Sequence, residues 1–369
     1  MILTSIKLRN FRVHADLEME FTDSLNYIVG GNGQGKTTIL ESIYYLCTTK
    51  SFNARTDAEV VSFGKEGFEI TGHFRDITED SVRIICNLND LKKSYFLNDK
   101  NLNRYSNIIG KFPIVLLAPS DHSITQGAPG ERRKFIDSVI SQASSTYLKS
   151  LIDYNRTLKH RSSLLNRLKD FRTKDMIIEL DAWTAKLVEI GSEIILWRKT
   201  FIKEFNSFLR ESYYRIMEQE KPLIDYYHLD GYNGDEVKNH FEQMIDEKRN
   251  EEFTRATNLV GPHRDDFIFS INNSNLKTYG SQGQHKTFQT ALRFAEFFYL
   301  KEITTKTPIF LLDDVFGELD AMRAQRISEY LKDIGQAFVT ITDFGNIAYL
   351  KNDEDDTLIN LNEGNVVYA

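Results

Sequence analysis

One stretch of the sequence has the residue types and the spacing of a phosphate-binding loop. GGNGQGKTT contains Gly30-x-x-x-x-Gly35-Lys36-Thr37, between an apolar run and a segment with helical spacing. Its glycines let backbone N–H groups curl around a phosphate, and the next helix adds the partial positive charge of its N-terminus. Lys36 would place its charge on the β- and γ-phosphates, Thr37 would offer its hydroxyl to Mg²⁺, and Thr38 would contact the α-phosphate. The residues predicted to bind the nucleotide are Gly30, Gly31, Asn32, Gly33, Gln34, Gly35, Lys36, Thr37 and Thr38.

A phosphate loop also needs an acid that positions the metal, and PIFLLDDV supplies two. Asp313 and Asp314 follow an apolar run at the C-terminal end of a predicted strand, where ligand-handling residues lie in an α/β sheet. We predict that Asp313 holds Mg²⁺, directly or through water, and that Asp314 is the catalytic acid that polarises the attacking water. The alternative is that the two acids merely end a strand and cap a helix.

A second polar stretch, YGSQGQHKT at residues 279–287, also precedes an apolar run with helical spacing. A turn of glycine, serine and glutamine at a helix start is typical of a phosphate site as well. Two phosphate-facing elements in one chain make sense if they serve different nucleotides, one in each subunit of a dimer. In an isolated monomer we then expect Ser281 to lie far from Lys36 and to face solvent.

The elements that must position these residues predict an α/β fold with a mixed sheet. Alternating polarity or short apolar runs indicate strands at residues 2–8, 17–21, 25–29, 68–74, 82–88, 94–97, 112–119, 308–315 and 337–343. The sequence TLINLNEGNVVY near the end predicts a hairpin that turns at 362–365.

The middle of the chain has a different character. From residue 131 to 222 apolar residues recur at three-to-four spacing, which predicts two or more long antiparallel helices with a turn near 171–174. We therefore expect an ATPase lobe made of residues 1–130 and 223–369, with a helical lobe of residues 131–222 inserted between its two parts.

Composition sets the broad class of protein. The chain has 369 residues, 41% of them hydrophobic and 27% charged, which is typical of a soluble globular protein. This length is too great for one small core, so we expect either one large domain with an insertion or two domains. No apolar run reaches ~18 residues, so we predict no membrane span. The N-terminal residues also lack the apolar run of a signal peptide. Only Cys47 and Cys86 are present, which argues against a disulfide scaffold and suits a reducing, cytoplasmic setting.

Charge is distributed unevenly along the chain. The net charge is −7, yet residues 149–174 hold eight Lys and Arg against two Asp. One interpretation is a solvated helix face, and the other is an arm that contacts the phosphates of DNA. The DNA-contact candidates are Lys149, Arg156, Lys159, Arg161, Arg167 and Lys169.

Six stretches, in this order, resemble the RecF family of bacterial recombination mediators over nearly the whole chain. They are LRNFR, GGNGQGKTTILESIYYL, GERRKFID, GPHRDDF, SQGQHKT and LLDDVFGELD. The wider class is the ATPase heads of SMC and ABC proteins, in which a Walker A loop pairs with a distant signature, Leu-Ser-Gly-Gly-Gln. The residues that align with that signature are Gly280-Ser281-Gln282-Gly283-Gln284.

The resemblance implies an ABC-type ATPase lobe plus a helical lobe, without the long coiled coil of SMC proteins. It implies a weak, DNA-stimulated ATPase that uses ATP and Mg²⁺ and forms a homodimer when ATP is bound. It also implies action at single-strand/double-strand junctions of gapped DNA, with RecO and RecR as partners, to help RecA load. A protein of this kind would be associated with the nucleoid.

Site roles follow from the same resemblance. Ser281, Gly283 and Gln284 would form the signature, which contacts the γ-phosphate of ATP held by the other subunit. Asp320 would be the D-loop residue near the dimer interface, and Gln126 the Q-loop glutamine that binds the metal. The resemblance also places Arg12 near the nucleotide and makes residues 342–343 a sensor of the γ-phosphate.

The sequence departs from the ABC pattern at three positions. Asp314 stands where transporters have glutamate, and its shorter side chain predicts slow turnover suited to a switch. Gly280 and Gln282 replace the signature leucine and a glycine, which argues against a transporter. The alternatives are another P-loop enzyme, such as a small-molecule kinase in which SQGQ only caps a helix, and a nuclease fused to an ABC-like ATPase.

Other residues have simpler interpretations. We expect His263 to be hydrogen-bonded near a strand start and Arg264 to pair with Asp265 or Asp266. Arg132 and Arg133 either make capping interactions or face DNA. His122, His160 and His285 are expected to be exposed, and Trp183 and Trp197 to line one packed face.

Overall fold

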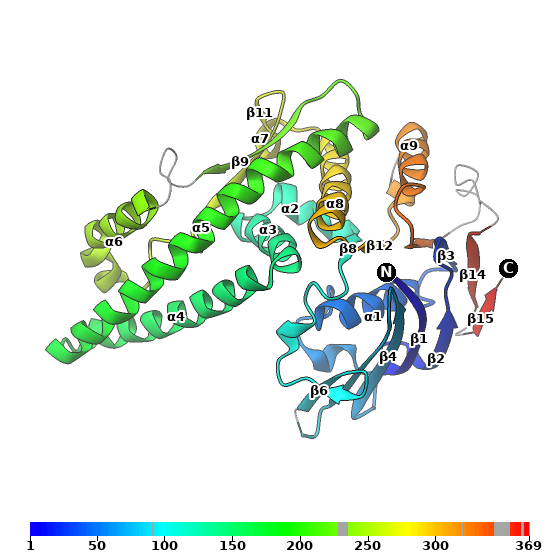
Figure 1. Ribbon diagram of the computed structural model, residues 1–369, viewed down its shortest axis with the longest axis horizontal. Helices are drawn as coiled ribbons and strands as arrows, with labels where there is room; N and C mark the ends of the chain where they lie inside the picture. Colours follow the sequence, from blue (N-terminus) through cyan, green and yellow to red (C-terminus); the bar gives the residue numbers. More distant parts are fainter. Residues whose placement is uncertain (91, 228–234, 319, 343–354, 363–364, 369) are drawn as a thin grey trace. The chain divides into compact units, whose positions relative to one another are not determined.

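The computed structural model describes residues 1–90, 92–227, 235–318, 320–342, 355–362 and 365–368. The chain forms two compact units (Figure 1). Unit 1 comprises residues 1–121, 212–218 and 289–369, and unit 2 comprises residues 122–211 and 219–288.

A mixed sheet, largely parallel, forms one layer of unit 1. Its strand order is β15-β14-β3-β13-β12-β8, with only β15 antiparallel to its neighbour. Strands β3, β12, β13 and β8 are buried at every position, as expected for parallel strands covered on both faces. The strands are β3 (Leu25–Val29), β8 (Ile114–Leu117), β12 (Ile309–Leu312), β13 (Ala337–Ile341), β14 (Thr357–Asn362) and β15 (Asn365–Tyr368).

An antiparallel sheet forms the second layer of unit 1, with the order β2-β1-β4-β5-β6-β7. Buried and exposed residues alternate along its strands, because one face packs on the core and the other is solvated. Its strands are β1 (Ile2–Phe11), β2 (His14–Glu20), β4 (Gly67–Arg75), β5 (Glu79–Asn87), β6 (Lys92–Leu97) and β7 (Lys100–Asn101).

Helix α1 (Lys36–Thr48) lies between the two sheets and contacts strands of both (Figure 1). Ile39, Leu40, Ile43 and Leu46 of this helix join side chains of both sheets in one core cluster. The predicted strands are confirmed, and the antiparallel pairing of β14 with β15 confirms the hairpin, although residues 363–364 of its predicted turn lie outside the described residues. The other α-helical parts of unit 1 are α9 (Ala321–Leu331), the part of α8 (Gln282–Thr304) from Gln289 onward and the end of α5 (Lys174–Ile216) from Ser212 onward.

Unit 2 is built on the predicted pair of long antiparallel helices. Helix α4 (Ser145–Asp170) ends at the expected turn, and α5 (Lys174–Ile216) returns alongside it. Hydrogen bonds from Ser150 to Glu193 and from Arg161 to Thr184 record the antiparallel pairing. The remaining elements of this unit are α2 (His122–Gln126), α3 (Pro129–Ala143), β9 (Pro222–Tyr227), α6 (Asp235–Arg255), β10 (Asp266–Ile271), β11 (Ser274–Asn275), α7 (Leu276–Tyr279) and the start of α8, up to Phe288.

The boundaries of the units differ from the predicted lobes. The sequence predicted that the ATPase lobe resumes at residue 223, but residues 219–288 belong to unit 2. The physical reason is pairing that the sequence does not display: β9 pairs with β10, α3 contacts β10, and α6 packs on α4.

A buried ion network fixes the centre of unit 2. Arg198 of α5 is 2% exposed and donates to both carboxylate oxygens of Asp137 at 2.9 and 3.0 Å. It also donates to Asp265 Oδ2 at 3.3 Å and to the carbonyl oxygen of Pro262 at 2.7 Å. Burial alone would lower the pKa of Arg198, but its carboxylate neighbours outweigh that effect and raise it. One side chain therefore ties α5 to α3 and to the segment before β10.

Two further arginines extend this network. Arg132 makes a two-pronged ion pair with Asp266, at 2.8 and 2.9 Å, and Arg133 donates to the carbonyl oxygen of Asp265. The motifs GERRKFID and GPHRDDF thus meet inside unit 2, and both arginines have structural partners there. None of the described helices is both long and apolar enough to cross a membrane.

Candidate nucleotide site

The phosphate loop links the end of β3 to the start of α1, as the motif requires. The N–H of Gly30 donates to the carbonyl oxygen of Ile341 on β13, which anchors the entrance of the loop. Gly33 and Gly35 have φ of 80° and 91°, in the left-handed region that favours glycine. At Gly35 a Cβ would also lie 2.5 Å from His14 Nε2, so no other residue fits there.

Lys36 is folded over its own loop. Its Nζ donates to the carbonyl oxygens of Gly30 at 2.6 Å and Gly31 at 2.9 Å. Burial lowers the pKa of Lys36, while the carboxylates of Asp314 and Asp313 oppose that change. The charge of Lys36 thus lies inside the loop that is expected to surround the phosphates, and near the two predicted acids.

Thr37 and Asp313 lie together, as predicted from motifs that are far apart in the sequence. Thr37 Oγ1 donates to Asp313 Oδ1 at 2.8 Å, and Asp313 is only 7% exposed. Burial raises the pKa of Asp313, and hydrogen bonds from Thr37 and Thr340 counteract this. Since Mg²⁺ prefers oxygen ligands and commonly takes one or two from the protein, this hydroxyl and carboxylate fit it.

Asp314 has a different environment from its neighbour. It is exposed, has a left-handed backbone with φ of 50°, and accepts a hydrogen bond from Thr342 Oγ1 at 3.0 Å. Within the described part of the chain, the bonds of Asp313 and Asp314 run to threonine side chains of α1 and of β13 and its end, and none runs to the N-terminus of a following helix. This geometry disfavours the alternative in which the acids only end a strand and cap a helix.

The predicted signature begins helix α8 as a capping box. Ser281 Oγ accepts from the N–H of Gln284 at 3.2 Å, and Gln284 Oε1 accepts from the N–H of Ser281 at 2.9 Å. Gln284 Nε2 donates in addition to Glu220 at 2.7 Å. Ser281 is exposed, as expected, and its hydroxyl proton is not used by the capping box. The two bonds between Gln284 and Ser281 fix the turn before the helix. Gly283 lies in the first turn of the helix.

Asp320 caps another helix. Its carboxylate accepts from the N–H of Arg323 at 3.0 Å and from the Arg323 guanidinium at 2.5 Å, and these bonds lower its pKa. The capped helix is α9, which follows the acid pair in the chain after a short 3-10 helix, Phe316–Glu318. The D-loop role of Asp320 stays a prediction.

Two predicted residues of the nucleotide site have other surroundings. Arg12 makes a two-pronged pair with Glu41 of α1, at 2.7 and 2.9 Å, so its charge is already balanced. Gln126 is exposed at the end of α2 in unit 2, whereas Thr37 and Asp313 belong to unit 1. The metal-binding role of Gln126 therefore stays a prediction. Residue 343 lies outside the described residues.

One of the DNA-contact candidates is wrong. Arg161 is 2% exposed and pairs with Glu252 at 2.6 Å, while its other nitrogens bond Asn258 and Thr184. A guanidinium held inside unit 2 by three partners cannot contact DNA. The other candidates are exposed, namely Lys149, Arg156, Lys159, Arg167 and Lys169.

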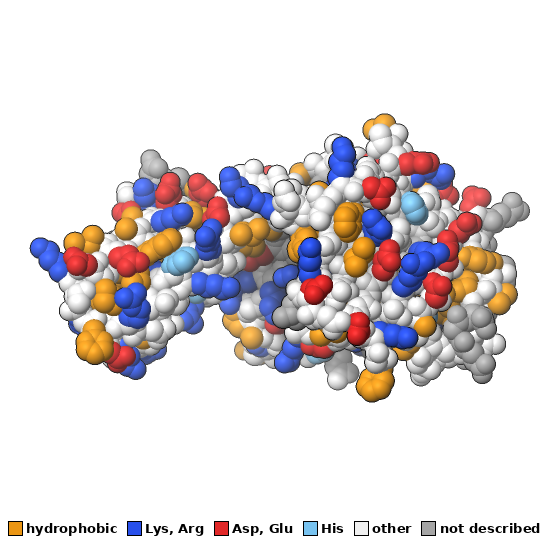
Figure 2. All heavy atoms as spheres, turned by 90° about the horizontal axis from the view of Figure 1, so that it is seen from below, with side chains coloured by type: hydrophobic (Ala, Val, Ile, Leu, Met, Phe, Trp, Pro, Cys, Tyr) orange, Lys and Arg blue, Asp and Glu red, His pale blue; other side chains and the backbone are white. Residues whose placement is uncertain are grey.

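Removing Arg161 makes the predicted arm more regular. At 100° per residue, Lys149, Arg156, Lys159 and Arg167 fall on the solvent face of α4, opposite its packed face, whereas Lys169 lies to one side. Figure 2 shows Lys and Arg side chains over this helix interspersed with other side chains.

Predictions for the remaining polar residues had mixed outcomes. His263 bonds Tyr154 and the carbonyl oxygen of Asn258 just before β10, as expected. Arg264 instead donates to the Asn258 carbonyl oxygen, because Arg198 and Arg132 already pair with the two aspartates. His122 and His160 are exposed, but His285 is 5% exposed, since it lies on the packed face of α8.

The two tryptophans both contact rings of α4. Trp183 stacks on His160 at 4.5 Å between ring centroids, and Trp197 meets Tyr147 edge-on at 6.2 Å. Trp183 is partly buried, but Trp197 is 39% exposed, so the prediction that the two line one packed face is wrong for Trp197.

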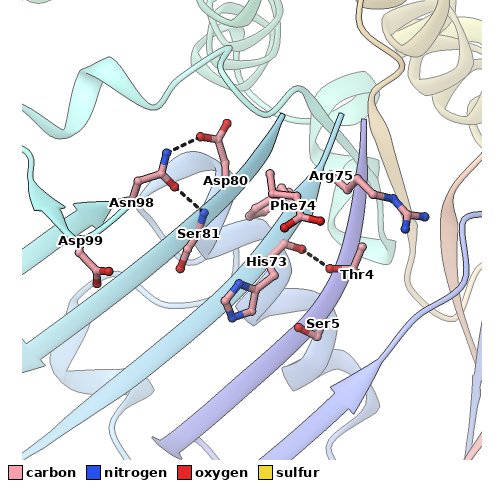
Figure 3. Close-up of a pocket in the computed structure, with 10 residues that line it drawn as sticks. Thr4, Ser5, His73, Phe74, Arg75, Asp80, Ser81, Asn98 and Asp99 are labelled. Carbon is pink, nitrogen blue, oxygen red and sulfur yellow. Dashed lines mark hydrogen bonds between the residues drawn. The ribbon is translucent and has the colours of Figure 1, made fainter. Parts of the chain in front are cut away.

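A polar hollow of about 610 Å³ opens on the antiparallel sheet of unit 1 (Figure 3). Within it Asn98 bonds Asp80 and the N–H of Ser81, and Thr4 bonds the carbonyl oxygen of His73. None of its lining residues is a predicted site residue, and these polar groups satisfy one another, so we assign the hollow no role.

Sequence reasoning missed two residues of consequence. Thr340 contacts both acids of the site, and its signal was a lone hydroxyl in the buried strand AFVTI, which must find a partner. Arg198 organises unit 2, and its signal was an arginine among apolar residues of a long helix.

A phosphate loop between a parallel strand and a helix, with an acid pair two strands away and a second, antiparallel sheet, defines an ABC-type ATPase head. A solved Smc head domain from Pyrococcus furiosus has this fold: it is 16% identical, with a TM-score of 0.59, and the match covers 100% of this chain and 96% of that one. The family model described as RecF/RecN/SMC N terminal domain matches residues 2–347.

Relatives with higher sequence identity show to which family of ABC-type ATPase heads the chain belongs. The DNA replication and repair protein RecF of Chloroherpeton thalassium is 38% identical over 95% of this chain and 97% of its own length. A solved structure of the recombination mediator protein RecF with ATP, in the RecFOR pathway, has a TM-score of 0.89 and 29% identity over 100% of this chain and 99% of that one. The chain belongs to the RecF family. This membership decides against the small-molecule kinase and the nuclease fusion.

Proposed function

We propose that the protein is an ATP-driven switch of DNA replication and recombinational repair. It binds gapped DNA or single-strand/double-strand junctions, dimerises with ATP, and helps a recombinase load together with RecR- and RecO-like mediators. The observation that carries this proposal is that the two phosphate-facing elements belong to different compact units. The Lys36 loop belongs to unit 1, and the exposed Ser281 begins a helix in unit 2.

Hydrolysis follows from the chemistry of each side chain. The loop N–H groups and Lys36 would hold the phosphates, and Thr37 and Asp313 would hold Mg²⁺, which would supply positive charge to offset that of the phosphates. Asp314 accepts a proton from water as the water oxygen bonds to the γ-phosphorus. The bond from that phosphorus to the β,γ-bridging oxygen breaks, and ADP and phosphate leave.

Ser281 completes the site of a partner subunit. Its Oγ accepts the Gln284 N–H in the capping box, which leaves the hydroxyl proton to donate to a γ-phosphate outside its own helix. The positive end of α8 adds to this attraction. ADP lacks the γ-phosphate, so hydrolysis removes the contact and releases the dimer.

Replacing Ser281 with arginine should abolish dimerisation with ATP, because a bulky side chain would block the partner's phosphate. Sedimentation velocity should show wild type as a dimer with ATP and a monomer with ADP, and Ser281→Arg as a monomer with both. The matched control is Ser207→Arg on the exposed face of α5, which should dimerise like wild type. Wild type that stays monomeric with ATP and gapped DNA would contradict the dimer mechanism.

Neutralising the arm on α4 should weaken DNA binding without regard to sequence. In a triple variant, Arg156, Lys159 and Arg167 are replaced by alanine. We expect affinity to fall about tenfold or more at moderate salt, and the slope of log K against log salt to flatten by about 2 to 3, as each lost phosphate contact removes nearly one. Fluorescence anisotropy with gapped DNA measures both. The control triple Lys65→Ala, Lys92→Ala and Lys100→Ala removes the same charge from unit 1. An unchanged slope in the α4 variant would place the DNA contacts elsewhere.

A further inference from the structure

A single hydroxyl group in the core of unit 1 touches both predicted acids. Thr340 lies on β13 between β3 and β12, in a strand whose other residues are apolar, and it is 1% exposed. A hydroxyl in such a place must satisfy its hydrogen-bonding capacity within the protein.

Both bonding functions of this hydroxyl are used by the acid pair. Thr340 Oγ1 accepts from the backbone N–H of Asp314 at 2.8 Å and donates to Asp313 Oδ1 at 2.9 Å. The carbonyl oxygen of Leu312, at 3.4 Å, is the longer alternative for the single proton. Since a carboxylate is the stronger acceptor, the proton goes to Asp313.

The backbone of Asp314 explains why such a bond is needed. Its φ of 50° is unfavourable for a residue with a side chain, so the surroundings must hold it there. Thr340 fixes the N–H of this residue, and Thr342 fixes its carboxylate at 3.0 Å. Two threonines on alternate positions of one strand end thus set the direction in which Asp314 points.

The bond to Asp313 has a second consequence. Thr37 and Thr340 donate to the same oxygen of Asp313, one from the phosphate loop and the other from the sheet. The bond from Thr340 does not depend on the loop. It therefore keeps the carboxylate aligned when Thr37 turns its hydroxyl to other partners.

We propose that Thr340 is a positioning residue that orients the metal-holding acid and the water-polarising acid together. It touches neither ATP nor the attacking water and acts through Asp313 and Asp314. The inference rests on the roles proposed above for those two residues.

Thr340→Val keeps the shape of the side chain and removes the hydroxyl. We expect its turnover rate to fall about 10- to 100-fold, the range found when a supporting hydrogen bond to a metal site is lost. Thr340→Ser, which restores the hydroxyl, should stay within about threefold of wild type. Thr157→Val, a buried threonine on the packed face of α4, is the control for the substitution itself.

Nucleotide binding gives a readout that does not depend on hydrolysis. Affinity for ATP in EDTA should be equal in wild type and Thr340→Val, because the phosphate loop is intact. The gain in affinity on adding Mg²⁺ should be about tenfold smaller in Thr340→Val and nearly normal in Thr340→Ser. A normal gain and rate in Thr340→Val, or equal losses in the valine and serine variants, would overturn the inference.

Hydrogen exchange tests the contact in the wild-type protein, whether or not the valine variant folds. The Asp314 amide should exchange slowly although its residue is exposed, and fast exchange would overturn the inference. Asp314→Asn distinguishes a failure of the inference about Thr340 from a failure of the proposed function. If Asp314→Asn is slow while Thr340→Val is normal, only the role of Thr340 fails. If Asp314→Asn hydrolyses ATP normally, the proposed hydrolytic site itself is wrong.

Discussion

Replacing Asp314 with asparagine is expected to slow ATP hydrolysis by at least about a hundredfold while ATP still binds, because a well-placed general base contributes 10² or more to a rate. Asparagine keeps the size of the side chain and can still accept the bond from Thr342. It also tolerates the left-handed backbone observed at this position. The substitution removes the negative charge and with it the ability to take a proton, so the effect should appear in the turnover rate and not in the affinity for ATP.

The comparison needs a matched control and a second readout. Asp16→Asn removes the same charge from an exposed position on β2 and should leave hydrolysis unchanged. With ATP, Asp314→Asn should accumulate the dimer for longer than wild type, since release follows hydrolysis. Single-turnover kinetics and sedimentation in the same buffer measure the two effects. Hydrolysis at the wild-type rate would remove Asp314 from the mechanism.

The phosphate loop and the acid pair were predictable because their signals are local. Each motif carries its own strand, turn or helix start, and parallel strands place their carboxyl ends at one edge of a sheet. The bond between Thr37 and Asp313 follows from that rule, although 276 positions separate the two residues. The turn between α4 and α5 was also predictable, because the helical spacing of apolar residues is interrupted there.

What the sequence did not reveal depends on partners that are remote and have no pattern of their own. Arg161 looks like its exposed neighbours on α4, and only Glu252 and Asn258, 91 and 97 positions away, show that it is buried. The same holds for β9, whose pairing with β10 places residues 219–288 in unit 2. The number of basic residues along a helix does not distinguish side chains that could contact DNA from side chains that form buried ion pairs.

Two further features of α8 can be read from the sequence itself. Ser281-x-x-Gln284 is a capping box that can be read directly from the sequence. It shows that SQGQ caps a helix, as the kinase alternative assumed, and yet leaves the serine proton available to a phosphate. His285 lies three and seven positions before Phe288 and Leu292, which are fully buried, so its own burial follows from helical periodicity.

Removing the charge of Arg198 should destabilise unit 2 by about 3 to 5 kcal/mol, the usual cost of leaving a buried charge without its partner. Arg198→Met fills a similar space but leaves the carboxylates of Asp137 and Asp265 without their ion-pair partner on α5. Both tryptophans of the chain, Trp183 and Trp197, belong to unit 2. Urea unfolding followed by tryptophan fluorescence therefore reports on this unit, while ATP binding reports on the loop in unit 1.

Two further variants test whether the loss of stability in Arg198→Met comes from the unpaired carboxylates. Arg210→Met removes an exposed arginine of α5 and should change the free energy of unfolding by no more than about 0.5 kcal/mol. Adding Asp137→Asn and Asp265→Asn to Arg198→Met should restore part of the stability, because no unpaired charge then remains. A loss below about 1 kcal/mol in Arg198→Met, or no recovery in the triple variant, would contradict this account. In that case the arginines and aspartates of GERRKFID and GPHRDDF would need a role other than holding α3, α5 and β10 together.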